Sequence, residues 1–243
     1  MAKVAVVGLG EVGRPLLEVV ERAGHAVVGI DVAPLELPGR GSLDVLHICF
    51  PFEIDDFVGE SQRYIQLLEP RLTVINSTVS VGTTRSVHER THCLLVHSPV
   101  RGKHLRMTEE LLRYTKFIGP IDAAAGGAAE EHFSSLGMST KTLASPEATE
   151  LAKLSETTYF AVMIAWAQEM ERLCDRIGVD YDEVVSIYEE IDFFPPVKFF
   201  PGVIGGHCVL PNIELLKRID DSPILKAIRS SNAAKVERED SGS

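Results

Sequence analysis

The sequence has few cysteines, a single tryptophan and no long apolar run. Its cysteines are Cys49, Cys93, Cys174 and Cys208, and no two of them form a CxxC pair, so the pattern predicts neither a zinc site nor a disulfide framework. No apolar run approaches the roughly 20 residues that cross a bilayer. The N-terminus enters a β-branched segment directly, without a cleavage site. We therefore expect a cytoplasmic protein that makes no contact with a membrane and has no metal centre.

Positive charge is also scarce. The formal net charge is −11, and no stripe of lysine and arginine runs along the chain, which argues against a nucleic-acid-binding surface. Hydrophobic residues make up 45% and charged residues 24%, the ordinary composition of a globular protein. A chain of 243 residues is large for one core, so a nucleotide-binding domain with a smaller second domain is the natural expectation.

The first 31 residues read as strand, turn, helix and strand. Lys3–Val7 is a short apolar, β-branched run that leads into the glycine-rich stretch Gly8–Gly13. Apolar residues recur at helical spacing over Arg14–Ala23, and strand character returns over Ala26–Ile30. This order of elements is typical of a dinucleotide-binding unit.

Each glycine of the turn has a physical role. Gly8 allows a tight turn out of the strand, Gly10 removes a side chain that would keep a pyrophosphate from the backbone, and Gly13 lets the helix pack against the sheet. The phosphates would lie at the positive N-terminal end of the helix that starts near Glu11. Asp31, at the end of the second strand, can accept hydrogen bonds from a ribose 2′-hydroxyl and would repel a 2′-phosphate, so NAD is favoured over NADP.

Further strands alternate with helices along the first half of the chain, which predicts an α/β fold with a Rossmann-like, doubly wound parallel sheet. The strands are expected at Asp44–Phe50, Leu72–Asn76, His92–His97, Thr115–Ile118 and Thr140–Leu143, with a helix at Asp55–Leu68. Ligands bind outside the carboxyl ends of such strands. The expected cofactor-binding residues are therefore Gly8, Gly10, Glu11, Val12, Gly13, Asp31, Phe50, Pro51, Ser77 and Thr78. An alternative is that the hydroxyls of Ser77–Thr84 only cap the helix that begins near Thr84.

The character of the chain changes at Ser145. Ser145-Pro146-Glu147 is a helix start, and one long helix can run from there to Ile177, closed by Gly178. Its apolar surface is wider than one small domain can cover, so we expect the segment 145–177 to form a homodimer seam. The remaining helices are expected at Tyr181–Glu190, Ile213–Ile219 and Pro223–Ala234. This predicts a dinucleotide-binding domain over 1–144, a smaller all-α domain with one long central helix over 145–234, and a disordered tail over 235–243.

Several separate blocks resemble the nucleotide-sugar 6-dehydrogenases, the UDP-glucose and GDP-mannose dehydrogenase group. The blocks are Gly8–Leu16, Ile48–Pro51, Ser77–Thr84, Glu150–Leu154 and Pro201–Cys208. The last block, PGVIGGHC, is the most specific, because a cysteine that closes PGxxGGHC downstream of an AKL helix points to this family. The resemblance covers residues 3 to about 232.

The resemblance implies two successive hydride transfers to NAD, which convert a primary alcohol of a sugar to a carboxylate through a thioester. Cys208 matches the family's nucleophile, and a thiol can capture an aldehyde as a thiohemiacetal. Lys153 matches a helix lysine that stabilises a developing oxyanion, and Thr78 matches a position beside the nicotinamide and the catalytic water. The implied substrate-binding residues are Thr157, Gly205, Gly206 and His207. His207 is more simply a structural residue, because side chains of sequence neighbours such as His207 and Cys208 rarely face each other.

The chain also departs from the family pattern. Thr157 stands where the family has an asparagine, and Val100 stands where the family has an acid–base glutamate. After the cysteine the family usually continues with a proline and then a lysine or aspartate. In Val209–Asn212 the proline stands later, and no charged residue follows it. The family continues after the helix that ends near Asn232 into a second nucleotide-binding domain. We therefore expect a short form that lacks the domain that grips the nucleotide of the substrate.

The leading hypothesis from the sequence is an NAD-dependent dehydrogenase that oxidises a primary alcohol of a sugar, nucleotide-sugar or related small molecule. A simpler two-electron enzyme, like the related β-hydroxyacid dehydrogenases, needs no thiol. A non-catalytic or regulatory protein that binds a nucleotide would explain the replacements at Val100 and Thr157. A Rossmann protein that binds another adenosine cofactor, such as S-adenosylmethionine, would use Asp31 and the same turn. Only ligand binding separates these hypotheses.

Overall fold

The structure is a computed structural model of the chain. It describes all residues except 32–42, 102–105, 193–199, 206–208 and 242–243. The chain divides into two compact units, Met1–Lys153 and Leu154–Ser243. The division lies inside the long helix α6 (Pro146–Ile177).

Unit 1 is built on a seven-stranded sheet in the order β2-β1-β3-β4-β5-β6-β7. The strands are β1 (Lys3–Val7), β2 (Ala26–Ile30), β3 (Val45–Ile48), β4 (Leu72–Ile75), β5 (Leu95–His97), β6 (Lys116–Pro120) and β7 (Thr140–Thr142). All adjacent pairs are parallel except β5 and β6. The fold is therefore α/β and Rossmann-like, as the alternation of strands and helices predicts.

The strand order places a ligand-binding crevice at a defined point. The chain passes from β1 to β2 on one side and then returns to β3 on the other side of β1. At such a switch point the loops after the two central strands diverge and leave space at the carboxyl edge of the sheet. The turn Gly8–Val12 follows β1, and Cys49-Phe50-Pro51 follows β3, so both segments lie at this switch point.

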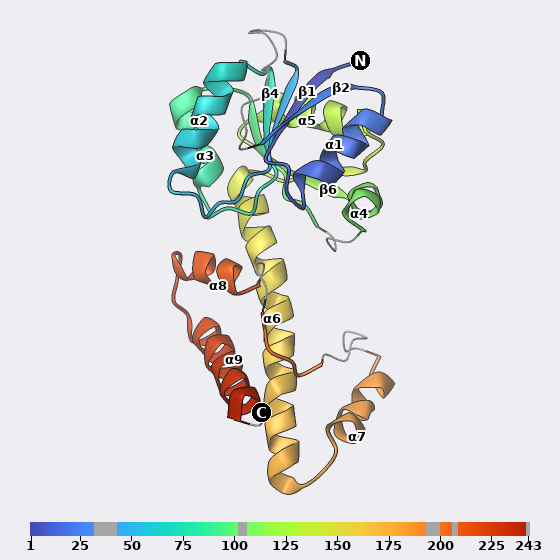
Figure 1. The fold of residues 1–243 in the computed structure, drawn as a ribbon, viewed down its shortest axis with the longest axis vertical. Coiled ribbons are helices and arrows are strands. Elements are labelled where there is room, and N and C mark those ends of the chain that lie inside the picture. Colours follow the sequence, from blue (N-terminus) through green and yellow to red (C-terminus); the bar gives the residue numbers. More distant parts are fainter. Residues whose placement is uncertain (32–42, 102–105, 193–199, 206–208, 242–243) are drawn as a thin grey trace. The chain divides into compact units, whose positions relative to one another are not determined.

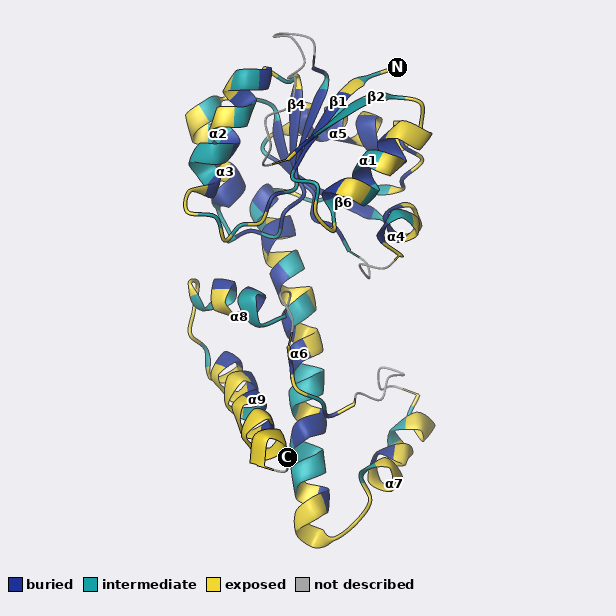
Figure 2. Ribbon diagram, viewed as in Figure 1, coloured by how far each residue is buried: buried dark blue, intermediate teal, exposed yellow. Residues whose placement is uncertain are grey.

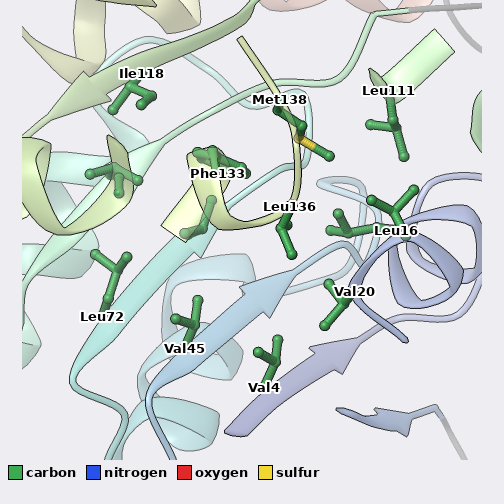
Figure 3. Packing of buried hydrophobic residues seen from close by; sticks show 14 of the residues in the cluster. Val4, Leu16, Val20, Val45, Leu72, Leu111, Ile118, Phe133, Leu136 and Met138 are labelled. Carbon is green, nitrogen blue, oxygen red and sulfur yellow. The ribbon is translucent and has the colours of Figure 1, made fainter. Parts of the chain in front are cut away.

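Helices cover both faces of the sheet (Figure 1). One face carries α2 (Phe57–Leu68) and α3 (Thr83–Thr91), and the other carries α1 (Gly13–Arg22), α4 (Met107–Arg113) and α5 (Ala123–Ser135). Figure 3 shows the core on the face covered by α1, α4 and α5, in which Leu16 and Val20 of α1 and Phe133 of α5 pack against Val4 and Val45 of the sheet. The central strands are buried on both faces (Figure 2), which explains why they read as nearly continuous apolar runs.

Three features of unit 1 differ from the expectation. β6 runs antiparallel to β5, because the chain between them leaves and re-enters the sheet at the same edge. The helices α4 and α5 were not predicted from the sequence. Asp122 caps α5 by accepting a hydrogen bond from the backbone N–H of Ala125 at 2.8 Å, a start signal that the glycine and alanine content of the segment conceals.

Unit 2 holds the rest of α6, together with α7 (Tyr181–Val185), a 3₁₀ helix η2 (Ser186–Glu190), α8 (Val209–Lys217) and α9 (Pro223–Ser241). Its small core contains Ala161 of α6, Ile204, Ile213 of α8 and Leu225 and Ile228 of α9. No helix of the described residues is long and apolar enough to span a bilayer.

The expectation of a disordered tail from Lys235 was wrong for residues 235–241, which continue α9. Lys235 is buried, and its ammonium lies 2.8 Å from a carboxylate oxygen of Glu171 and 3.5 Å from one of Glu239. Arg238 pairs with Asp175 of α6. These contacts with α6 stabilise a helix whose composition alone resembles a solvated tail.

Candidate functional site

The glycine-rich turn is held so closely that two of its glycines leave no room for a side chain. A Cβ atom on Gly8, whose φ is +89°, would lie 2.5 Å from the backbone nitrogen of Phe50. A Cβ on Gly13 would lie 1.8 Å from the carbonyl oxygen of Gly8. In contrast, a Cβ on Gly10 would meet no heavy atom within 4 Å. Gly8 and Gly13 therefore set the shape of the turn, and Gly10 leaves its outer surface open.

The turn leads into the N-terminus of α1. The N-cap residue, Val12, makes no side-chain hydrogen bond to the helix start. Unpaired N–H groups and the helix dipole at such an end attract an anion. Glu11, which precedes this N-cap, is an exposed residue. Asp31 is exposed directly after β2, the position that a ribose-binding carboxylate requires.

Polar groups tie the neighbouring strand ends together. The Ser77 hydroxyl, after β4, donates to the carbonyl of Phe50, after β3, at 2.6 Å. Ser77 and Phe50 are buried, Thr78 is half-buried and Pro51 is exposed. The structure thus brings these expected cofactor-binding residues to one edge, and it assigns the Ser77 hydroxyl to holding that edge.

A carboxylate from α6 caps α3. The buried side chain of Glu150 accepts hydrogen bonds from the backbone N–H groups of Gly82 and Thr84, at 2.7 and 2.8 Å, and from the Thr84 hydroxyl at 2.7 Å. Arg85 of α3 donates to Glu147 at 2.5 Å. The alternative given for these hydroxyls therefore holds for Thr84, whose hydroxyl serves the helix start and not a ligand.

Lys116, the first residue of β6, is a buried cation at the same edge. Its Nζ donates to the carbonyls of Ser98 and Pro99, at 2.7 and 3.2 Å, and to Asn76 Oδ1 at 3.3 Å. Burial lowers the pKa of Lys116 to about 7, and the positive charges of Lys153 and Arg101 act in the same direction. Burial raises the pKa of the nearby Cys49 thiol to about 12.

A chain of hydrogen bonds runs from Lys116 into the sheet. Because an ammonium only donates, the Asn76 atom that it contacts is the oxygen, and Asn76 Nδ2 then donates to His47 Nδ1 at 3.0 Å. His47 must therefore carry its proton on Nε2, which lies 2.9 Å from Nε2 of His132. Burial lowers the pKa of both histidines, so Lys116 is the member of this hydrogen-bonded series that can carry a positive charge near neutral pH.

His97 links β5 to the first turn of α6. The ring is fully buried, with Nε2 3.1 Å from the carbonyl of Ser77 and Nδ1 2.8 Å from the Thr149 hydroxyl. Burial is the main cause that lowers the pKa of His97 to about 3, and the charges of Lys116 and Lys153 act in the same direction. The half-buried Lys153, the expected oxyanion-stabilising residue, is thus close enough to act electrostatically at the carboxyl edge of the sheet.

The three buried histidines predict a loss of stability in mild acid. Their folded-state pKa values lie below the unfolded value of 6.5, at about 3 for His97 and about 4 for His132, and below it for His47. Unfolding therefore takes up protons as the pH falls below 6.5, and each histidine lowers the free energy of unfolding by about 1.4 kcal/mol per pH unit. We expect urea unfolding of the protein to show this slope between pH 6.5 and 5.

The test compares one variant in this network with one outside it. His97→Gln keeps a donor and an acceptor but does not titrate, so the pH slope should fall by the share of one histidine. Ser86→Ala, an exposed change on α3, should leave the slope unchanged. An unaltered slope in His97→Gln would contradict the assignment.

In unit 2, the segment Pro201–Gly205 is fixed to α6 and α9 by two amides. Asn232 Oδ1 accepts from the Ile204 N–H at 2.6 Å, and Asn232 Nδ2 donates to the Ile204 carbonyl at 3.0 Å. Gln168 Nε2 donates to the carbonyl of Gly202 at 2.7 Å and to Asn232 Oδ1 at 3.3 Å. The two side chains hold this segment as a neighbouring strand would.

Replacement of this amide should destabilise unit 2. Asn232→Leu leaves the buried N–H and carbonyl of Ile204 without partners, and we expect the free energy of unfolding to fall by about 2–4 kcal/mol. Urea unfolding followed by circular dichroism measures this change. Ser230→Ala, an exposed change on the same helix, should alter the stability by less than about 0.5 kcal/mol. Equal stabilities of the two variants would contradict the role of Asn232.

Known proteins resemble this chain both over its C-terminal half and over nearly its whole length. Residues 147–234 match the profile of the UDP-glucose/GDP-mannose dehydrogenase family, central domain. Over 95% of its length, the chain is 25% identical to the UDP-N-acetyl-D-mannosamine dehydrogenase of Methanococcus maripaludis. Residues 147–234 are thus similar to the central domain of the UDP-glucose/GDP-mannose dehydrogenase family. The chain also matches an NDP-N-acetyl-D-galactosaminuronic acid dehydrogenase of Ralstonia nicotianae, at 23% identity over 96% of the chain and 69% of that relative.

Solved dehydrogenase structures share the fold. The UDP-D-ManNAc dehydrogenase of Pyrococcus horikoshii superimposes with a TM-score of 0.81 at 22% identity, covering 95% of this chain and 68% of that one. A 3-hydroxyisobutyrate dehydrogenase of Mycobacterium tuberculosis gives a TM-score of 0.74 at 18% identity, covering 98% of this chain and 93% of that one. The chain spans 65% of the length of the Methanococcus relative.

The structure places some of the residues that depart from the family pattern. Val100 is buried in the core of unit 1 with Met107 and Leu111, and its hydrocarbon side chain has no proton to give. The Thr157 hydroxyl donates to the Leu154 carbonyl at 3.1 Å and accepts from Asn212 Nδ2 at 2.9 Å, which ties α6 to α8.

The block with the expected nucleophile is described only in part. Gly205 is exposed, and a Cβ on it would meet nothing within 4 Å. Gly206, His207 and Cys208 lie outside the described residues. Their proposed roles therefore rest on the sequence, while the segment before them is anchored by Asn232 and Gln168.

Sequence reasoning missed the buried polar residues of the ligand edge, Lys116, Asn76, His47 and His97. One signal was present, because Lys116 and His47 each interrupt an apolar strand with a titratable side chain. The polar groups that Lys116 and His47 contact depend on how β3, β4, β5 and β6 align in the sheet. The sequence pattern does not predict that alignment.

Proposed function

We propose that this protein is an NAD-dependent oxidoreductase that oxidises a primary alcohol of a nucleotide-sugar or a related sugar. The observation that carries the proposal is the closed turn Gly8–Gly13 at the switch point, with Asp31 after β2 and Lys153 acting at the same edge. The turn supports a cofactor with a pyrophosphate, and Asp31 supports one with an unmodified ribose 2′-hydroxyl.

The chain's own residues supply orientation and charge. Gly10 admits the pyrophosphate to the backbone, and the N-terminus of α1 attracts its charge. Bound NAD would supply the hydride acceptor. Lys153 would stabilise the negative charge that develops on the alcohol oxygen as its proton leaves. Thr78, half-buried beside the strand ends, would orient a water molecule with its hydroxyl.

Cys208 decides how far the oxidation goes. Its thiolate would add to the aldehyde carbon, and loss of a second hydride from the resulting thiohemiacetal would leave a thioester that water hydrolyses to the carboxylate. This path consumes two equivalents of hydride acceptor per alcohol. Gly205, Gly206 and His207 would lie beside the substrate, together with Thr157.

The substrate class comes from the relatives. Those matched here are named for UDP-N-acetyl-D-mannosamine and NDP-N-acetyl-D-galactosaminuronic acid, so N-acetylated nucleotide-sugars are the first substrates to test. Remote contacts to a nucleotide position the reacting carbon. Because the chain spans 65% of the first relative, part of those contacts would come from outside the matched region.

NADH formation tests this proposal. The purified protein should increase the absorbance at the NADH band with NAD and one member of a panel of N-acetylated UDP-sugars, UDP-glucose and GDP-mannose. Cys208→Ser should stop the reaction at the aldehyde, with at least a 100-fold loss in carboxylate formation, since a hydroxyl is a much weaker nucleophile. Cys208→Ala is the matched control that removes the nucleophile altogether. Unchanged carboxylate formation in both variants would reject the covalent path.

A two-electron oxidation of a β-hydroxyacid is the second candidate. It is favoured by the similarity in length to the 3-hydroxyisobutyrate dehydrogenase, because this chain covers 93% of that protein. Such a reaction needs Lys153 and no thiol. NADH formation with 3-hydroxyisobutyrate or L-serine, equal in the protein and in Cys208→Ser, would select this candidate over the first.

A homodimer through α6 forms part of the proposal. Tyr159, Phe160, Trp166 and Leu173 are large apolar side chains that α6 exposes. Exposed apolar side chains gathered on one helix are typical of a protein interface. The expected cytoplasmic location stays a prediction from the sequence.

A further inference from the structure

Lys116 is buried at the ligand edge but has no part in the chemistry above. Among the described residues, its hydrogen-bond acceptors are the carbonyls of Ser98 and Pro99, which follow β5, and Asn76 Oδ1, which follows β4. An ammonium has three protons, so these acceptors use its full donor capacity. Lys116 therefore cannot reach a substrate as an acid or base, but it joins the ends of two neighbouring strands.

Cys49 connects this cation to the dinucleotide turn. A Cβ on Gly13 would lie 3.4 Å from the Cβ of Cys49, so the Cys49 side chain lies directly against the turn. The thiol of Cys49 also interacts electrostatically with Lys116. The negative charge of a pyrophosphate on the turn would therefore act on Lys116 across the Cys49 side chain.

The charge of Lys116 is balanced near neutrality. Burial lowers its pKa to about 7, so the ammonium and the neutral amine are both populated there. The neutral amine has two protons and a lone pair, and it cannot satisfy three acceptors. The titratable or charged groups around it are Cys49 and His47 of β3, His97 of β5, His132 of α5, Arg101 after β5 and Lys153 of α6. Above pH 7 the neighbouring thiol and the buried histidines are neutral, which leaves Lys116 as the group that can take up a proton.

We propose that Lys116 is a positioning residue that takes up a proton when an anionic dinucleotide binds, and that the ammonium so formed fixes the ends of β4 and β5 around the cofactor. The proposal rests on the proposed function, because it requires a dinucleotide on the Gly8–Gly13 turn. The negative pyrophosphate favours the charged form of Lys116, and by linkage the charged form favours dinucleotide binding.

Calorimetry of NAD binding to the full chain tests this. Near pH 8, the binding enthalpy in buffers of different ionisation enthalpy should reveal the uptake of a fraction of a proton, and the affinity should fall about tenfold between pH 6.5 and 8.5. Lys116→Arg stays charged, so it should retain the affinity and lose both the proton uptake and the pH dependence. Lys116→Met should lose the proton uptake and bind about tenfold more weakly at pH 6.5.

The control is Lys141→Met, an exposed lysine of β7 whose Nζ lies over the Phe117 ring. It should bind NAD like the unmodified protein, with the same proton uptake. NAD binding without proton uptake, or with uptake unchanged in Lys116→Arg, would overturn this proposal and leave the proposed function standing. Absence of NAD binding by the unmodified protein would overturn both. If Lys116→Met does not fold, the unmodified protein and Lys116→Arg still decide.

Discussion

Gly13→Ala should abolish dinucleotide binding and destabilise unit 1. The added methyl carbon would lie 1.8 Å from the carbonyl oxygen of Gly8 and 2.9 Å from its carbonyl carbon, both backbone atoms that cannot rotate away. α1 must therefore move from the sheet, which also disturbs Leu16 and Val20 in the core. We expect NAD affinity to fall by at least 100-fold in calorimetry, with a loss of about 3 kcal/mol or more in the free energy of unfolding.

Gly10→Ala separates ligand binding from folding at the same turn. Its methyl group would meet no heavy atom within 4 Å, so the stability should stay within about 0.5 kcal/mol of the unmodified protein. The same methyl group occupies the surface on which a pyrophosphate would lie, so NAD affinity should fall about tenfold or more. If Gly10→Ala binds NAD normally, the cofactor does not approach the turn.

Lys153→Met should lower kcat by about 100- to 1000-fold while NAD affinity changes little. Lys153 is half-buried in α6, and its charge lowers the pKa of both His97 and Lys116, which places its field at the carboxyl edge of the sheet. Removal of one group that stabilises a developing oxyanion costs about this factor. Steady-state kinetics of NADH formation with the identified substrate measure the change.

The thermal stability of the variants and the activity of Lys153→Arg distinguish this catalytic role of Lys153 from a structural one. Lys153→Arg keeps the charge and should recover part of kcat. If Lys153 were only structural, Lys153→Met and Lys153→Arg would lose activity in parallel with their thermal stability. Lys141→Met provides the control for removal of a lysine elsewhere in unit 1. A kcat within twofold of the unmodified enzyme in Lys153→Met would show that Lys153 does not act on the reacting oxygen.

The sequence predicts the first half of the fold well because local rules act there together. The apolar run, Gly8 and Gly13 each constrain the same strand-turn-helix-strand unit, and the structure contains that unit with Asp31 directly after β2. The long helix α6 begins at Pro146 and ends at Ile177, as the Ser145-Pro146-Glu147 start and Gly178 predict. Start and stop signals of this kind are encoded within a few residues.

The features that sequence reasoning missed depend on distant parts of the chain. The direction of β6 depends on the edge at which the chain re-enters the sheet, and α9 continues through Lys235 because Glu171 lies beside it. The buried contact of Lys116 with Asn76 joins residues 40 positions apart. Local propensity describes none of these pairs, because each exists only after the elements have packed.

The cofactor preference tests the central claim most directly. Calorimetric titration of the purified protein with NAD, NADP and S-adenosylmethionine compares the three ligands on the same turn. The account predicts saturable binding of NAD at one site per chain, binding of NADP at least tenfold weaker because Asp31 repels a 2′-phosphate, and no binding of S-adenosylmethionine. Binding of S-adenosylmethionine alone would contradict the account, since the turn would then serve a different cofactor and the protein would not be a dehydrogenase.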